Sequence, residues 1–285
     1  MLIALKSAIL GIIQGLTEFI PVSSSGHLIL ASKLFGWHDK WLPGTTTGAT
    51  INTTALAFSV ALHIGTLLAL LIYFNREWIP LIKGFFTGFA NKPTRWDNDQ
   101  RLAWMIVIAT IPAAVVGALF GDTIEGHLST PFWIAICLLA VSFVMLAAQM
   151  IGSKARDIDQ LNGKDALLVG TGQVLALAPG VSRSGITISG GLFTGLDFES
   201  AARFAFLIAA PITAGSGILE GWKLAKHGLP PHFAQIFVPG FVTAAVVGVL
   251  AIGFMLRYLR TGTLTPFIIY RFVVAAAVLV ILAVR

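Results

Sequence analysis

Charged residues are scarce in this chain of 285 residues: Asp, Glu, Lys and Arg make up 11% of it, against roughly 25% in soluble domains. Hydrophobic residues make up 56%, and the mean hydropathy is +0.85. This composition excludes a soluble globular domain, and the length suffices for about six to eight membrane segments of ~20 residues each. We therefore expect an integral membrane protein.

Cysteine is nearly absent, and several catalytic motifs are missing. The single Cys137 excludes disulfides and cysteine-based metal sites. The sequence has no GxxxxGK[ST] loop and no HExxH pair, which excludes a P-loop and the common zinc-peptidase site. The stretch 180–185, GVSRSG, is not a GxSxG nucleophile elbow, because Ser184 occupies the place of the second glycine.

Acidic residues are outnumbered by basic ones, which gives a net charge of +6. The basic residues lie between apolar runs, so membrane topology and anionic lipid explain them, and we expect no nucleic-acid partner. Ten of them fall on one side of the expected spans: Arg76, Lys83, Lys92, Arg95, Arg101, Lys154, Arg156, Lys164, Arg257 and Arg260. Six fall on the other side: Lys6, Lys33, Lys40, Lys223, Lys226 and Arg285. The side with ten is expected to be cytoplasmic, which places both termini in the periplasm.

Six apolar runs are long enough to cross a bilayer, at about 54–74, 101–120, 132–151, 201–219, 234–255 and 264–284. Two further segments, about 2–35 and 165–197, are apolar but divided by Pro, Gly and Ser into pieces of about 14 residues. Such pieces are too short to cross, so we predict an all-α membrane protein with two re-entrant helical hairpins whose turns line a site. The longest connections are expected at 36–53 and 75–100.

The two broken segments resemble each other. Residues 11–28 read GIIQGLTEFIPVSSSGHL, and residues 170–187 read GTGQVLALAPGVSRSGIT. They match at a constant offset: Gly11/Gly170, Gln14/Gln173, Val22/Val181, Ser23/Ser182, Ser25/Ser184 and Gly26/Gly185. Three crossings follow each segment, so the second half of the chain is inverted relative to the first. We predict one membrane domain over 1–285, with inverted repeats at about 1–151 and 165–285 whose hairpin tips meet near the midplane.

Glu18, His27 and Arg183 are the main candidates for chemistry in these segments. Gln14 and Glu18 are four residues apart and share a helix face, where a carboxylate and an amide oxygen form a half-site for a hard divalent cation. A lone carboxylate in an apolar helix is costly and by default functional, a protonated core Glu being the alternative. His27 follows three serines and is interpreted as a general acid/base or a nucleophile rather than a structural histidine.

Arg183 lies between two serines at an expected helix start. A planar guanidinium, hydroxyls and free N–H groups together form a phosphate clamp, a snorkelling arginine being the alternative. His63 is interpreted as a packing or helix-bridging histidine, and Arg203 and Arg271 as interfacial anchors. This set of side chains, with one arginine, several hydroxyls, metal-binding oxygens and one histidine, fits a phosphate or pyrophosphate group. A lipid would carry that group while its tail remains in hydrocarbon.

The stretches 14–27, QGLTEFIPVSSSGH, and 179–187, PGVSRSGIT, resemble signatures of the bacterial undecaprenyl pyrophosphate phosphatases of the bacitracin-resistance type. The stretches 111–124 and 266–278 support a resemblance over essentially the whole chain. It implies hydrolysis of undecaprenyl pyrophosphate to undecaprenyl phosphate and inorganic phosphate, which recycles the lipid carrier for peptidoglycan synthesis and confers bacitracin resistance. It also implies a requirement for Mg²⁺ or Ca²⁺ in a multi-pass inner-membrane protein whose site opens to the periplasm.

The resemblance also implies roles for single residues. The catalytic positions are Glu18, Ser24, His27 and Arg183, and it stays open whether Ser24 or His27 attacks phosphorus. Substrate-binding positions are Ser23, Ser25, Ser182, Ser184, Gly185 and Thr187. Glu18 and Gln14 are the metal candidates, and Gln14 stands where other members have Glu, so a mechanism that needs two carboxylates on this helix is in doubt here.

Two alternatives remain. A polyprenyl-phosphate transporter would use the same inverted repeats and broken helices. A phosphatidic-acid-phosphatase-type enzyme would account for SSGH, but in its SRxxxxxHxxxD motif the His place is Ser189 and the Asp place is Phe193. The sequence does not fix the oligomeric state, for which a homodimer is one expectation.

Overall fold

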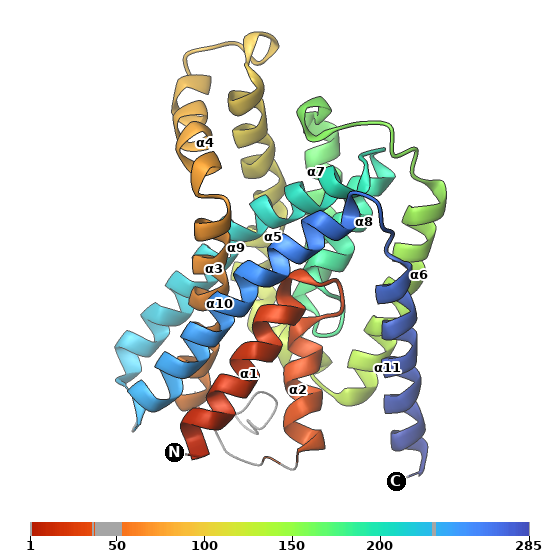
Figure 1. Cartoon of the computed structure of the whole chain (residues 1–285). Coiled ribbons are helices and arrows are strands. Elements are labelled where there is room, and N and C mark those ends of the chain that lie inside the picture. The colour runs from red at the N-terminus through yellow and green to blue at the C-terminus, as the bar shows by residue number, and fades with distance from the viewer. Residues whose placement is uncertain (1, 36, 38–52, 230–231, 285) are drawn as a thin grey trace.

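The computed structural model describes residues 2–35, 37, 53–229 and 232–284, and these form helices without a strand (Figure 1). The helices are α1 (Leu2–Phe19), α2 (Ser24–Leu34), α3 (Thr53–Tyr73), α4 (Asn75–Gly88), α5 (Asn98–Leu128), α6 (Pro131–Ile151), α7 (Gly163–Val174), α8 (Arg183–Phe193), α9 (Phe198–His227), α10 (Phe233–Leu259) and α11 (Thr265–Val284). Short 3₁₀ turns η1 (Pro93–Arg95), η2 (Ile158–Gln160) and η3 (Leu175–Leu177) join them.

Six helices of the described chain are long and apolar enough to cross a membrane, namely α3, α5, α6, α9, α10 and α11. They coincide with the six predicted spans, and α9 extends to 30 residues, beyond both predicted ends. The fold class is therefore confirmed as an all-α integral membrane protein with several crossings. Lys40, Arg285 and most of the connection 36–53 lie outside the described residues.

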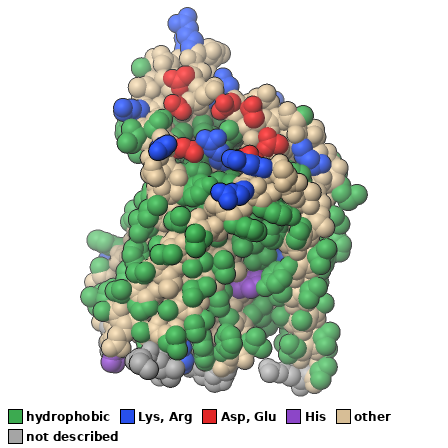
Figure 2. Space-filling view, viewed as in Figure 1, with side chains coloured by type: hydrophobic (Ala, Val, Ile, Leu, Met, Phe, Trp, Pro, Cys, Tyr) green, Lys and Arg blue, Asp and Glu red, His purple; other side chains and the backbone are tan. Residues whose placement is uncertain are grey.

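Charge is segregated along the long axis of the molecule. Figure 2 shows Lys, Arg, Asp and Glu gathered at the end opposite the two termini, above a broad hydrophobic surface. Helices that begin at the charged end are capped by polar side chains: Asp97 and Gln100 form a capping box on α5, and Asn162 and Asp165 form one on α7. Such caps satisfy backbone N–H groups that a helix leaves free at its start.

Two helical hairpins, α1–α2 and α7–α8, accompany the six long helices. In Figure 1, α1 and α2 reverse direction near the middle of the molecule, on the side of the termini, and α7 and α8 do so from the other side. Helices α2, α7 and α8 have 11, 12 and 11 residues, about 18 Å or less at 1.5 Å per residue, against a hydrocarbon core of ~30 Å. Helix α1 has 18 residues, more than the 14 predicted.

The glycines matched between the two halves bring helices together. Gly11 places α1 against α10, where an added Cβ would lie 2.6 Å from the carbonyl oxygen of Gly240. Gly170 places α7 against α5, where an added Cβ would lie 2.7 Å from Cα of Ala109. Both distances are too short for a side chain, so these positions require glycine for packing. In the same arrangement α3 packs on α9, and α6 packs on α11.

The long connection expected at 75–100 contains α4 and η1. Helix α4 packs against the start of α5, and the indole ring of Trp96 stacks on Trp104 at 5.6 Å between centroids. An aromatic cluster therefore anchors this connection at the charged end.

Candidate active site

The turns of the two hairpins have the same backbone construction. Ser23 and Ser182, which the offset pairs, both adopt a left-handed backbone with φ of 79° and 74°. Each hydroxyl accepts from the amide three residues later, Gly26 at 3.4 Å and Gly185 at 3.2 Å. A non-glycine residue at positive φ is strained and persists only where the surroundings hold it. Both turns are thus fixed, and each begins a helix whose first N–H groups face the turn.

A network of charged and polar side chains centred on Glu18 joins the two hairpins. The Arg183 guanidinium at the start of α8 forms an ion pair with Oε1 of Glu18 at the end of α1. The other carboxylate oxygen, Oε2, accepts from Ser24 Oγ at 2.5 Å and from Gln14 Nε2 at 3.0 Å. Only 7% of the Glu18 side chain and 17% of the Arg183 side chain is exposed, so water screens this pair weakly. The structure therefore brings four predicted site residues into contact.

His27 lies in the first turn of α2 and faces a residue that the sequence analysis did not single out. Its Nδ1 lies 2.7 Å from the carbonyl oxygen of Ser23, and its Nε2 lies 2.8 Å from the hydroxyl of Tyr270 on α11. Because a carbonyl only accepts, Nδ1 carries the proton and Nε2 accepts from Tyr270. The two rings also stack, with 5.6 Å between centroids. His27 is thus held in one tautomer by two partners.

Arg271 corrects one interpretation and adds a site residue. It is not an interfacial anchor: its side chain is fully buried, with 0% exposure, in the middle of the molecule. Its guanidinium donates to the carbonyl oxygen of Pro21 in the first turn, and to those of Gly180 and Val181 in the second turn, at 3.1 to 3.3 Å. Further bonds reach Ser142 Oγ and the carbonyl oxygen of Leu138 on α6. Arg271 therefore ties both hairpin turns to α6 and α11.

The remaining predicted residues surround this network in different ways. Ser184 donates to the carbonyl oxygen of Ile20 at 3.4 Å, a direct contact between the two hairpins. Ser25 is exposed, with its hydroxyl 3.5 Å from that of Ser23. Thr187 is fully buried and donates to the carbonyl oxygen of Arg183 at 2.7 Å, so its hydroxyl stabilises α8.

His63 lies where α3 packs against α9. Ser59, on the same helix α3, donates to Glu220 of α9 at 3.1 Å, and His63 Nδ1 lies 3.7 Å from the same carboxylate oxygen. Within the described residues, no three side chains of His, Cys, Asp and Glu gather in a way that could hold a metal ion. Any cation at Glu18 must therefore use other oxygen donors as well.

Tyr270 and Arg271 were missed as site residues, although a signal was present. Both lie inside the apolar run 264–284, where an ionisable side chain is expensive unless it has partners inside the protein. The sequence alone fits an Arg271 at the membrane surface as well as a buried one, because nothing in the local pattern reveals the carbonyl groups that it contacts.

Fold and site together define the class of this protein: a multi-pass helical membrane protein with a half-buried Arg–Glu–Ser network and a histidine where two helical hairpins meet. The model of the family described as bacitracin resistance protein BacA matches residues 7–277. The chain therefore belongs to this family.

Relatives from several bacteria support the assignment along the whole length. The chain is 42% identical over 282 residues to the undecaprenyl-diphosphatase of Moorella thermoacetica, covering 99% of this chain and 98% of the relative. It is 41% identical over 281 residues to that of Trichlorobacter lovleyi, covering 98% and 97%. It is 39% identical over 285 residues to that of Thermomicrobium roseum, covering 98% of each.

Proposed function

We infer that this chain is an undecaprenyl-diphosphatase, which hydrolyses undecaprenyl pyrophosphate to undecaprenyl phosphate and inorganic phosphate and so recycles the lipid carrier for cell-wall synthesis. The family and the relatives' name support this reaction over the alternative of a transporter. The observation that carries the proposal is the contact of Arg183, Glu18 and Ser24 across two hairpins, because phosphoryl transfer needs a cation for the phosphate, an oriented hydroxyl and a base.

The chain's own residues supply each of these parts. Arg183 has five N–H donors, of which Glu18 engages few, so the others are free to bind the terminal phosphate as a planar fork. Ser24 Oγ attacks phosphorus and passes its proton to Glu18 Oε2, to which it is already hydrogen-bonded at 2.5 Å. The bond from phosphorus to the bridging oxygen breaks, and undecaprenyl phosphate leaves. Water then hydrolyses the seryl phosphate and restores Ser24.

The geometry favours Ser24 over His27 as the nucleophile. Ser24 shares a hydrogen bond with the carboxylate that would accept its proton, whereas the free nitrogen of His27 accepts from Tyr270. His27 with Tyr270 is then the acid/base pair for the hydrolytic half of the reaction, where a proton must leave the attacking water. Ser23, Ser25, Ser182 and Gly185 shape the two helix N-termini that face the phosphates.

Glu18 and Gln14 are the proposed ligands of a divalent cation. Gln14 Oε1 is buried and has no hydrogen-bond partner within the described residues, although the Nε2 atom of the same amide donates to Glu18. An unpartnered buried acceptor beside a carboxylate fits a hard cation such as Mg²⁺ or Ca²⁺. When bound, the cation would neutralise charge on the phosphate oxygens.

The chain is proposed to lie in the bacterial inner membrane as one domain of two inverted repeats. The paired packing of α1 on α10 and α7 on α5 supports the repeats, and the short hairpin helices support a re-entrant arrangement. The gathering of Lys and Arg at the end opposite the termini supports a cytoplasmic location for that end, periplasmic termini and a site that opens to the periplasm. A homodimer is the state that we expect cross-linking in membranes to detect.

Hydrolysis by purified protein tests the proposal. We expect the protein in detergent to release phosphate from a polyprenyl pyrophosphate, and a chelator to abolish the release. Glu18→Gln and Arg183→Ala should each reduce the rate about a hundred-fold or more, since each removes a group that stabilises developing charge. Arg95→Ala, an exposed arginine of η1 at the charged end, is the matched control and should keep the wild-type rate.

Trapping the seryl phosphate separates the two candidate nucleophiles. Rapid acid quenching of the wild type should capture phosphate on Ser24, and His27→Gln should accumulate it because hydrolysis of the intermediate is slowed. Ser24→Ala should capture none. Folded wild type that binds the lipid and releases no phosphate would instead favour transport.

A further inference from the structure

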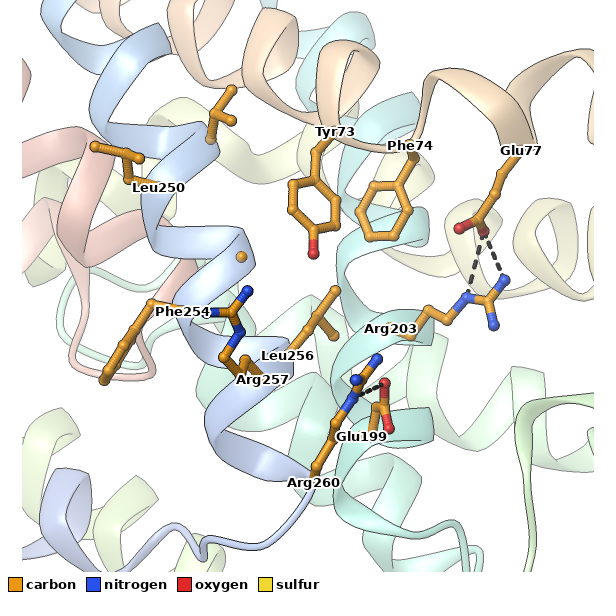
Figure 3. Close-up of a pocket in the computed structure, with 12 residues that line it drawn as sticks. Tyr73, Phe74, Glu77, Glu199, Arg203, Leu250, Phe254, Leu256, Arg257 and Arg260 are labelled. Carbon is orange, nitrogen blue, oxygen red and sulfur yellow. Dashed lines mark hydrogen bonds and ion pairs between the residues drawn. The ribbon is translucent and has the colours of Figure 1, made fainter.

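A second pocket lies at the charged end of the molecule, away from the hairpin turns. It has a volume of about 780 Å³ and is formed by the end of α3, the start of α4, the start of α9 and the end of α10 (Figure 3). It shares no lining residue with the Glu18–Arg183 site. Three arginines line it, Arg203, Arg257 and Arg260, with two glutamates.

The glutamates engage only part of the arginine donors. Arg203 binds Glu77 through Nε and Nη2, at 3.3 and 3.0 Å, and Arg260 binds Glu199 through Nε alone, at 3.0 Å. The two terminal nitrogens of Arg260 therefore remain available. Arg257 has no hydrogen bond or ion pair among the described residues, and it is exposed. Three arginines against two glutamates leave one positive charge in the pocket.

Tyr73 adds a neutral donor to the same space. Its ring packs beside Gly253 of α10, where an added Cβ would lie 3.3 Å from Cε2, and its hydroxyl makes no hydrogen bond within the described part of the chain. Figure 3 shows the hydroxyl directed into the pocket, between α10 and α9. A free guanidinium and a free phenol facing one hollow form a binding site for an oxygen anion.

The other walls of the pocket are apolar and continue toward the membrane. Leu250 and Phe254 line it from α10, and they are 67% and 52% exposed. Both precede Arg257 on a helix that is long and apolar enough to cross a membrane. We therefore expect them to face hydrocarbon tails of the leaflet whose headgroups reach the arginines. A ligand that fills this pocket therefore has both an anionic group and an apolar part.

We propose that this pocket binds an anionic phospholipid, with the phosphodiester on Arg257, Arg260 and Tyr73 and an acyl chain along Leu250 and Phe254. A phosphodiester carries one negative charge, which matches the single excess positive charge of the pocket. The site is separate from the hydrolytic centre, and the proposal does not depend on the proposed function.

Native mass spectrometry of the whole protein in a neutral detergent tests the proposal. We expect phosphatidylglycerol to remain bound and phosphatidylcholine, which has the same phosphate but a compensating cation, to bind more weakly. Arg257→Gln should weaken phosphatidylglycerol binding about ten-fold, the loss of one charge-assisted contact. Arg95→Gln, an exposed arginine outside the pocket, should bind as the wild type does.

Three outcomes would overturn the proposal. Equal binding of phosphatidylglycerol by wild type and Arg257→Gln would show that the lipid binds elsewhere. Displacement of the lipid by inorganic phosphate at equal concentration would indicate a site for a soluble anion. Tighter binding of polyprenyl phosphate than of phosphatidylglycerol, lost in Arg257→Gln, would assign the pocket to the product lipid. A melting temperature in detergent equal to that of the wild type confirms that Arg257→Gln is folded in each case.

Discussion

At the scale of single residues, the chemistry depends on which atoms of Glu18 are already engaged. One carboxylate oxygen binds Arg183, and the other accepts from Ser24 and Gln14. Without substrate, the arginine thus neutralises the carboxylate, which makes a buried charge at this position tolerable. In the proposed reaction, Arg183 shares its donors between the carboxylate and the incoming phosphate, and Ser24 is already oriented by its hydrogen bond to Glu18.

Gln14 offers a test of the metal assignment at the same scale. Its Nε2 lies 3.0 Å from Glu18 Oε2, so Gln14→Glu places two carboxylates side by side. Their repulsion is relieved by a divalent cation, and we expect the variant to show tighter apparent binding of Mg²⁺ or Ca²⁺ with activity preserved or raised. The measurement is phosphate release against metal concentration. An inactive, folded Gln14→Glu protein would mean that the amide donor is what the site requires.

At the scale of secondary-structure elements, Arg271 holds the two hairpin turns in register. Its donors reach carbonyl groups of both turns and of α6, and no carboxylate pairs with it in the described chain. Two strained turns that are proposed to bind one substrate need such a common support, since neither turn is fixed to the other by a helix.

Arg271→Ala should therefore act on both stability and catalysis. Loss of these bonds leaves buried carbonyl groups without donors and should lower the free energy of unfolding by about 3 kcal/mol or more. The melting temperature in detergent measures this change, with Arg95→Ala as the control. Added guanidinium should restore part of the hydrolytic rate by refilling the site. A variant as stable and as active as the wild type would contradict the role of Arg271.

At the scale of the whole molecule, the distribution of charge predicts the orientation in the membrane. Arg95 is the last residue of η1, in the connection between α4 and α5 at the charged end, and His227 is the last residue of α9, which ends on the side of the chain termini (Figure 1). Both residues are exposed. In a Cys137→Ser background, which leaves no other thiol in the chain, Arg95→Cys should react with a membrane-impermeant maleimide only from the cytoplasmic side. His227→Cys should react only from the periplasmic side. Labelling of both from one side would refute the arrangement.

The sequence by itself determined the six crossings, the two broken segments, and Glu18 and Arg183 as separate candidate site residues. These features are local: an apolar run of ~20 residues crosses a membrane whatever surrounds it, and a charge within an apolar helix is costly wherever it lies. The matched serines Ser23 and Ser182 also mark equivalent turns, because the same sequence pattern occurs in both halves of the chain.

Only the tertiary structure decided the partners. Arg183 meets Glu18 across 165 positions, His27 meets Tyr270 across 243, and Arg271 meets Pro21 across 250. An arginine within an apolar run can lie at the membrane surface or contact buried carbonyl groups, and the local sequence is the same in both cases. The choice between them depends on which helices pack together, and close approaches such as α1 on α10 and α7 on α5 make that choice.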